Sequence, residues 1–424
     1  MISVLLISIF IIGYTAIAFE HPLKLNKAAS ALLTGVLCWT VYILSGHSHS
    51  EVVEQLLHHL GDISSILFFL LGAMTIVELI DSHNGFEIIT TRIKTKSKRK
   101  LLVIITIITF FLSAILDNLT TAIVMSSLSA KLLTDKEDRF WFAGMIVIAA
   151  NAGGAWSPLG DVTTTMLWIG GQITALNIIV KTFLPSLAAA VIPLLLVSFR
   201  FKGKFLDASL AGIIKKEADR EGIIMLVCGV GLLLFVPVFK TTTHLPPFMG
   251  MLLALGLLWI ITTIIHSNKD EETKNKFTVS NALRRIDTPS ILFFLGILLA
   301  VAALESFGLL KDAATFLNST LKNDYYIGTA LGVLSSIVDN VPLVAASQGM
   351  YDLSTYPTDH NFWEFLAFTT GTGGSMIIIG SAAGVAVMGI EKISFGWYMK
   401  KISLLALAGF ISGILVYLAQ QSFF

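Results

Sequence analysis

Apolar runs of about 20 residues recur along the whole chain and are separated by short polar segments. Runs of that length can cross a hydrocarbon layer of about 30 Å as α-helices. A strand of a membrane barrel would instead alternate apolar and polar residues over about ten positions. The pattern therefore predicts an all-α polytopic membrane protein. Residues 2–19 form the first run, and because no basic segment precedes them we expect a retained helix rather than a signal peptide.

The composition supports the same fold class. Hydrophobic residues make up 55% of the 424 residues and charged residues only 13%, whereas about a quarter of the residues of a soluble protein are charged. The formal net charge is only +1. This near-zero net charge says nothing about partners; as a membrane protein the chain is expected to contact membrane lipid and small cations, and no nucleic acid.

Basic residues indicate which loops face the cytoplasm, because cytoplasmic loops carry an excess of Lys and Arg. Such residues concentrate at 92–100, 200–220 and 269–285. Segment 45–62 contains neither Lys nor Arg and is expected to be an outer loop. This assignment places the N- and C-termini on the outer side of the membrane.

Three motifs occur twice, in the same order, at separations of 225, 222 and 220 residues. They are ILFFLLG at 66–72 and ILFFLG at 291–296, DNLTTAIV at 117–124 and DNVPLVAA at 339–346, and GGAWSPLG at 153–160 and GGSMIIIG at 373–380. By the charge pattern, the first copy starts on the outer side and the second on the cytoplasmic side. The copies are therefore expected to be inverted in the membrane, as in many secondary transporters.

Acidic residues inside apolar runs are candidates for function, because each costs at least about 2.5 kcal/mol in the membrane. Asp117, Asp161 and Asp339 are the main examples, whereas Glu78 is expected to reach the membrane interface. We expect no Lys or Arg near the breaks at Asp117 and Asp339. Such carboxylates need a proton, a bound cation or water, and a site that alternates between proton and cation is an exchanger.

Polar residues beside these acids offer amide and hydroxyl oxygens, which suit hard cations such as sodium. The candidate ligands are Asn118, Thr120, Thr121, Asn151, Ser157, Thr163, Thr164, Asn340, Thr372 and Ser375. Any single Ser or Thr could instead bond back to the preceding helical turn. Sodium is predicted at Asp117 and Asp161, and no cofactor is expected.

Histidines gather in the expected outer loop, at His47, His49, His58 and His59. Imidazole binds transition metals and titrates near physiological pH, so metal capture and pH sensing are both open. A solvated loop explains the four residues equally well.

The segments DNLTT (117–121), NAGGAWSPLGDVTTTMLW (151–168), DN (339–340) and TGTGG (370–374) together resemble the NhaD-type sodium/proton antiporters of bacteria. These belong to the ion transporter superfamily, which also holds dicarboxylate symporters and arsenite pumps. The resemblance covers nearly the whole chain and implies a bacterial inner membrane, whose outer side is periplasmic. It implies a role in ion transport for Asp117, Asn118, Asn151, Asp161, Thr163, Thr164 and Asp339. Ser381 stands where the second copy would repeat Asp161.

The resemblance also implies two inverted repeats, each with a re-entrant hairpin and a broken helix; charge alone would equally allow two full crossings at 101–133. About ten transmembrane helices accompany the two hairpins. The expected divisions are N-terminal helices at 1–61, a first repeat at 62–199 (hairpin 101–133, broken helix 140–169), cytoplasmic loops and linking helices at 200–288, and a second repeat at 289–424 (hairpin 325–350, broken helix 362–390).

The expected function is secondary antiport rather than enzymatic catalysis: export of sodium, and of lithium, in exchange for protons, with activation at alkaline pH. The alternative is a sodium-coupled dicarboxylate symporter of the same superfamily. Aspartate at both hairpin tips argues against the alternative, because it would repel a dicarboxylate. By analogy with related folds, the protein could form a homodimer.

Overall fold

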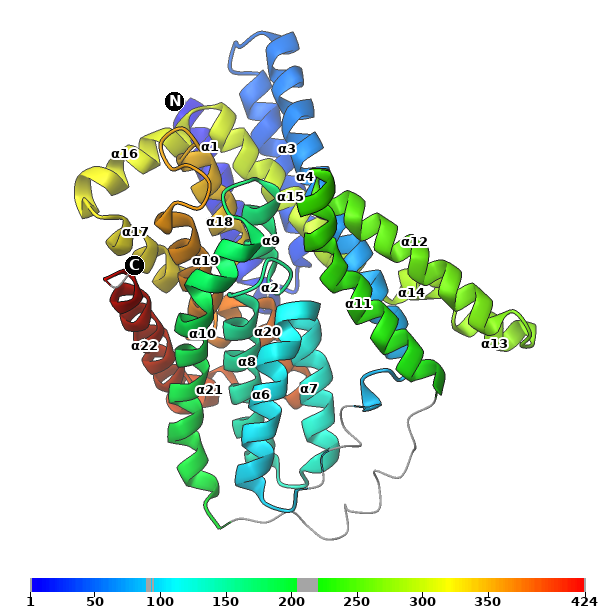
Figure 1. Ribbon diagram of the computed structural model, residues 1–424. Coiled ribbons are helices and arrows are strands. Elements are labelled where there is room, and N and C mark those ends of the chain that lie inside the picture. Colours follow the sequence, from blue (N-terminus) through cyan, green and yellow to red (C-terminus); the bar gives the residue numbers. More distant parts are fainter. Residues whose placement is uncertain (1, 89–92, 94, 204–219, 423–424) are drawn as a thin grey trace.

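The computed structural model describes residues 2–88, 93, 95–203 and 220–422, which fold almost entirely into α-helices (Figure 1). Within this part of the chain, seven helices are long and apolar enough to cross a membrane. They are α4 (His49–Ser82), α6 (Lys98–Leu116), α10 (Ala175–Ser198), α11 (Arg220–Thr243), α12 (Pro247–His266), α15 (Thr288–Ser306) and α22 (Ser403–Gln421). The chain is therefore a polytopic helical membrane protein. Parts of two predicted basic loops, at 89–92, 94 and 204–219, lie outside the described residues.

One group of helices is held together by close backbone contacts between small residues. Helix α3 (Lys27–Ile43) packs along α15, where a Cβ atom on Gly296 would overlap the backbone of Ala31. Small residues let helices approach closely in a membrane, where packing rather than water drives association. Helix α1 (Ile2–Ala18) lies against α3, and α4 lies against α15 and carries α11 and α12 on its other side.

The prediction of a loop at 45–62 is wrong over most of this segment, because α4 already begins at His49. The physical reason is that one face of the helix in this segment is buried, although the segment as a whole is polar in composition. Val52 and Ile63 are buried, and the Gln55 Oε1 atom accepts a 2.8 Å hydrogen bond from the Tyr42 hydroxyl of α3. These contacts extend α4 well beyond its apolar run.

Helices α6 and α7 (Asn118–Leu132) form an antiparallel hairpin joined by the single residue Asp117 (Figure 1). The backbone of Asp117 has φ 87°, which is uncommon for a residue with a side chain. Its carboxylate compensates by capping α7: it accepts hydrogen bonds from the backbone N–H and the hydroxyl of Thr120, each at 2.8 Å. The polar tip of the hairpin is thus a helix start.

Two helices are broken near their middle. The first consists of α8 (Lys136–Gly154) and α9 (Val162–Ile169), and the second of α19 (Asn361–Gly373) and α20 (Ala382–Glu391). A second hairpin, α17 (Asp324–Leu334) and α18 (Asn340–Met350), packs on α19. The shorter helices are α2 (Glu20–Leu23), α13 (Glu271–Lys276), α14 (Val279–Arg285), α16 (Leu309–Leu321) and α21 (Phe395–Lys401).

Each hairpin is fixed to its broken helix by the same kind of contact. Ser113 of α6 donates to the Ala150 carbonyl of α8 at 2.6 Å, and Ser335, just after α17, donates to the Thr370 carbonyl of α19 at 2.8 Å. Each broken helix also presents a glycine to the hairpin backbone: a Cβ atom on Gly153 would overlap a carbonyl oxygen of α6. The recurring sequence motifs therefore coincide with recurring contacts.

We predict that Gly153→Ala lowers the free energy of unfolding by about 1–3 kcal/mol, the usual cost of forcing extra volume into a packed contact. The new methyl group would press on the Phe110 carbonyl oxygen. The measurement is the thermal unfolding midpoint of purified protein in detergent. Gly256→Ala is the matched control, because no atom lies within 4 Å of a Cβ there. Equal midpoints for the two variants would contradict the close packing.

Candidate functional site

Four helices start around one region in the interior of the protein, and each start carries a polar cap. The capping residues are Asp117 of α7, Asp161 of α9, Asp339 of α18 and Ser381 of α20, and each side chain accepts a hydrogen bond from a backbone N–H of its helix. Helix N-termini carry partial positive charge, which stabilises carboxylates. The breaks predicted from the sequence thus bring three aspartates toward one place.

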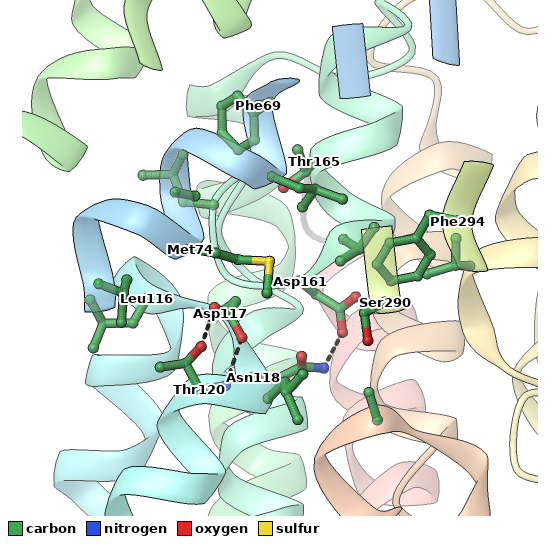
Figure 2. A pocket seen from close by; sticks show the side chains of 18 of the residues that line it. Phe69, Met74, Leu116, Asp117, Asn118, Thr120, Asp161, Thr165, Ser290 and Phe294 are labelled. Carbon is green, nitrogen blue, oxygen red and sulfur yellow. Dashed lines mark hydrogen bonds between the residues drawn. The ribbon is translucent and has the colours of Figure 1, made fainter. Parts of the chain in front are cut away.

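These three aspartates line a common cavity of about 60 Å³. Figure 2 shows the carboxyl groups of Asp117 and Asp161 pointing into it, with Phe69 and Phe294 lining it from different sides. A single water molecule needs roughly 10–15 Å³ of such space, so the cavity has room for a few waters or a partly hydrated cation. None of the ion pairs between described residues includes these aspartates.

Asp161 is the most enclosed of the three, with 2% of its surface exposed. Its Oδ1 atom accepts hydrogen bonds from the backbone N–H and the hydroxyl of Thr163, both at 2.9 Å. Its Oδ2 atom accepts from Asn118 Nδ2 at 2.6 Å, and Asn340 Nδ2 lies 3.3 Å from the same oxygen. Amides from both hairpin tips therefore meet on one carboxylate.

Asn151 of α8 connects this carboxylate to the second broken helix. Its Oδ1 atom accepts from Asn118 Nδ2 at 3.1 Å. Its Nδ2 atom donates to the hydroxyls of Ser375 and Ser381, each at 2.9 Å. Asn151 is fully buried, so one amide joins elements from the two halves of the chain in a continuous hydrogen-bonded network.

Asp339 lies where two cavities meet. Its Oδ1 atom accepts a hydrogen bond from the Val341 backbone N–H at 3.2 Å. It lines the cavity of Asp117 and Asp161 and also a second cavity of about 70 Å³, whose wall includes Tyr14 and Glu20. Asp339 is therefore the acid closest to the N-terminal helices.

Several predicted ligands bond to their own backbone rather than joining the network. The Ser157 hydroxyl accepts from the Leu159 N–H, Thr164 donates to the Asp161 carbonyl, and Thr372 donates to the Phe368 carbonyl. Thr121 is buried, and its hydroxyl has no hydrogen-bond partner among the described residues. Glu78 lies away from the site, 3.5 Å from Arg285. The hydroxyls of Ser157 and Thr372 thus bond to the backbone of their own segments beside the helix breaks.

Lys27 is the residue that the sequence pattern missed, and the expectation of no basic residue near the breaks is wrong. Lys27 lines both cavities with Asp339, and its charge interacts with that carboxylate. Its Nζ atom also lies 4.9 Å from the ring centre of Phe293. Lys27 belongs to α3, far from both breaks in sequence, and only the packing of α3 on α15 brings it here.

Comparison with known proteins places the chain among transporters. A family model described as "Citrate transporter" matches residues 14–363. "Sodium/proton antiporter 1" and "Sodium/proton antiporter 2" of Arabidopsis thaliana are 50% and 47% identical over 98% of this chain, covering 72% and 99% of their own lengths. "Na(+)/H(+) antiporter NhaD" of Vibrio cholerae is 31% identical over 98% of this chain and 91% of its own length.

We predict that Asn151→Ala lowers the free energy of unfolding by about 1–3 kcal/mol, because it removes three hydrogen bonds from a buried network, including the only hydrogen bond of the Ser375 hydroxyl among the described residues. Thr372→Val is the control, since the Thr372 hydroxyl bonds only within its own helix. Thermal unfolding in detergent should show a clear loss for the first variant and little change for the second. Similar midpoints would mean that the network contributes little to stability.

We predict that Lys27→Gln lowers the apparent KM for the transported cation by about two- to tenfold at fixed pH, because a positive charge leaves the cavity wall. Loss of the contact with Phe293 should also cost about 0.5–1 kcal/mol of stability. Lys27→Arg keeps the charge and should keep the KM. An unchanged KM in Lys27→Gln would show that this charge does not act on the site.

Proposed function

The chain belongs to the citrate transporter family and is similar over nearly its whole length to sodium/proton antiporters, and we propose that it exchanges sodium for protons. One observation carries the proposal: three carboxylates and two amides surround a small cavity inside a membrane protein. Oxygen ligands of this kind suit a hard monovalent cation. The same carboxylates can take protons, so the two ions would compete for one site.

The proposed exchange depends on the two amides that face Asp161. In the structure, Asn118 and Asn340 turn their NH₂ groups toward the carboxylate. A half turn of a side-chain amide would present its carbonyl oxygen instead. When sodium enters between Asp117 and Asp161, we expect these amides to change from hydrogen-bond donors to cation ligands. When a proton replaces sodium, they would turn back.

The helix starts favour a cation over the dicarboxylate of the alternative function. Helix N-termini attract anions, and an anion transporter can use them for its substrate. Here three of the four starts already carry an aspartate, and Ser381 alone leaves its helix end without a carboxylate. A dicarboxylate would meet like charges at both hairpin tips. Sodium would find the charge that it needs.

Alternating access would move the hairpins and broken helices relative to the α1–α3–α4–α15 group. We propose two inverted repeats with re-entrant hairpins and about ten transmembrane helices, because the hairpin contacts recur in both halves. Irregular backbone at the breaks is tolerated in a membrane because protein surrounds it. The basic loops would face the cytoplasm and both termini the outer side, with the protein in a bacterial inner membrane. A homodimer and transport of lithium are further parts of this proposal.

The test is dissipation of a proton gradient in inverted membrane vesicles after addition of sodium, lithium or potassium, over a series of pH values. We expect dissipation with sodium and lithium, strongest at alkaline pH. Protons and sodium compete for the carboxylates. In the pH range where these groups are mostly protonated, the apparent KM for sodium should therefore rise by about tenfold for each unit by which the pH falls. Asp117→Asn and Asp161→Asn should abolish the exchange.

Asp312→Asn is the matched control for the two variants, because Asp312 is exposed on α16. Exchange that survives both Asp117→Asn and Asp161→Asn would move the ion site elsewhere. Absence of cation-dependent dissipation, combined with sodium-driven uptake of citrate or succinate, would instead establish the symporter.

A further inference from the structure

A second and larger cavity, of about 470 Å³, lies toward the His-containing start of α4. Its wall includes His58, His59 and Asp62 of α4, Glu305 of α15, and the glutamines Gln172 and Gln348. The helices α9 and α18 contribute residues near their C-terminal ends, while their N-terminal ends hold Asp161 and Asp339. The two cavities therefore lie at opposite ends of the same two helices.

Three side chains in this cavity have the arrangement of metal ligands. One ligand atom each from His58, His59 and Asp62 can be chosen so that all lie within 4.8 Å of one another. Around tetrahedral zinc, with bonds of about 2.0–2.1 Å, neighbouring ligand atoms lie about 3.3 Å apart. The side chains of His58 and Asp62 are 77% and 73% exposed, so small rotations can close this difference without disturbing the core.

The surroundings of the cluster support a bound cation. Ser306 makes a 3.0 Å hydrogen bond with His59 Nε2, which helps to orient the His59 ring. Metal-binding imidazoles are commonly oriented by such a contact through the other ring nitrogen. Glu305 interacts electrostatically with His58, His59 and Asp62, and adds a second carboxylate to the cavity.

We propose that His58, His59 and Asp62, with Glu305 beside them, form a regulatory site for a zinc-class divalent metal ion. Imidazole nitrogen favours zinc and similar metals, whereas the oxygen ligands of the inner cavity favour sodium. The two cations would therefore not compete. A metal ion here would bridge α4 and α15 at the cavity that α9 and α18 also line. Its effect on exchange would come through Glu305, which lies against Gly349 of α18, the hairpin helix that starts at Asp339.

Glu305 lies directly against α18, a helix of the second hairpin. Its Oε2 atom would lie 2.7 Å from a Cβ atom on Gly349, so the carboxylate packs closely against α18 at that glycine. Metal binding at Glu305 would thus act on the second hairpin. His47 is separate from the cluster, because its ring lies against Tyr42 and its Nδ1 atom is 2.6 Å from the Ser45 hydroxyl.

The test is a calorimetric titration of Zn²⁺ into the purified full-length protein, from which any affinity tag has been removed because polyhistidine binds zinc. We expect one zinc ion per chain with a Kd on the order of micromolar. His58→Ala and Asp62→Asn should each weaken binding by at least about tenfold. His49→Ala is the control, because His49 lies on the same helix outside the cluster, and it should bind zinc like the wild type.

Cobalt provides a second readout that needs no transport activity. Co²⁺ bound to these ligands should give visible absorption bands that are lost in His58→Ala and retained in His49→Ala. Absence of zinc binding, or binding that His58→Ala leaves unchanged, would overturn the proposed site. In proteoliposomes, zinc added on the side of the cluster should inhibit exchange in the wild type but not in Asp62→Asn. Equal inhibition of both would overturn the regulatory role.

Discussion

The hydrogen bonds to the Asp161 carboxylate are the interaction on which the rest of the structure depends. A carboxylate held almost completely away from water is costly unless donors surround it. Here a threonine of the same helix start and amides from both hairpin tips supply those donors. Each amide can reach Asp161 only if its hairpin reverses direction inside the protein. The broken helices and both hairpins therefore follow from one buried charge that needs partners.

The two halves of the chain share a framework but not a charge distribution. Matching serines fix each hairpin to its broken helix. Yet α9 starts at Asp161 and α20 starts at Ser381, so the first half supplies two of the three aspartates of the cavity, and the second half supplies one aspartate, hydroxyls and an amide. Ser381, in place of a fourth aspartate, spares the site the repulsion that a further buried carboxylate would add. Asp117 and Asp339 line the wall of the same cavity.

Helix ends place different chemistry on the two sides of the same elements. The positive N-terminal ends of α9 and α18 carry aspartates at the inner cavity. Their other ends line the larger cavity with its histidines and Glu305. Rigid helices can transmit a change at one end to the other, because their internal hydrogen bonds resist bending. The inner cavity, at the N-terminal ends, therefore offers mainly oxygen ligands, whereas the larger cavity, at the C-terminal ends, also offers imidazole nitrogens.

The sequence by itself determined the helical membrane architecture and the two breaks at which Asp117 and Asp339 lie. Each of these features depends on the local spacing of apolar and polar residues. The sequence also indicated Asn118, Asn151, Asp161 and Asn340 as candidate site residues, because polar groups inside apolar runs are costly to bury without a partner or a ligand. It did not indicate that α4 begins at His49, because the composition of that segment is that of a loop. Only the tertiary structure decided that Lys27 faces Asp339. That approach depends on packing between α3 and α15, whose contacts join residues 260 positions apart, such as Trp39 and Leu299. Local patterns carry no record of such pairings, because they result from the fit of whole helices.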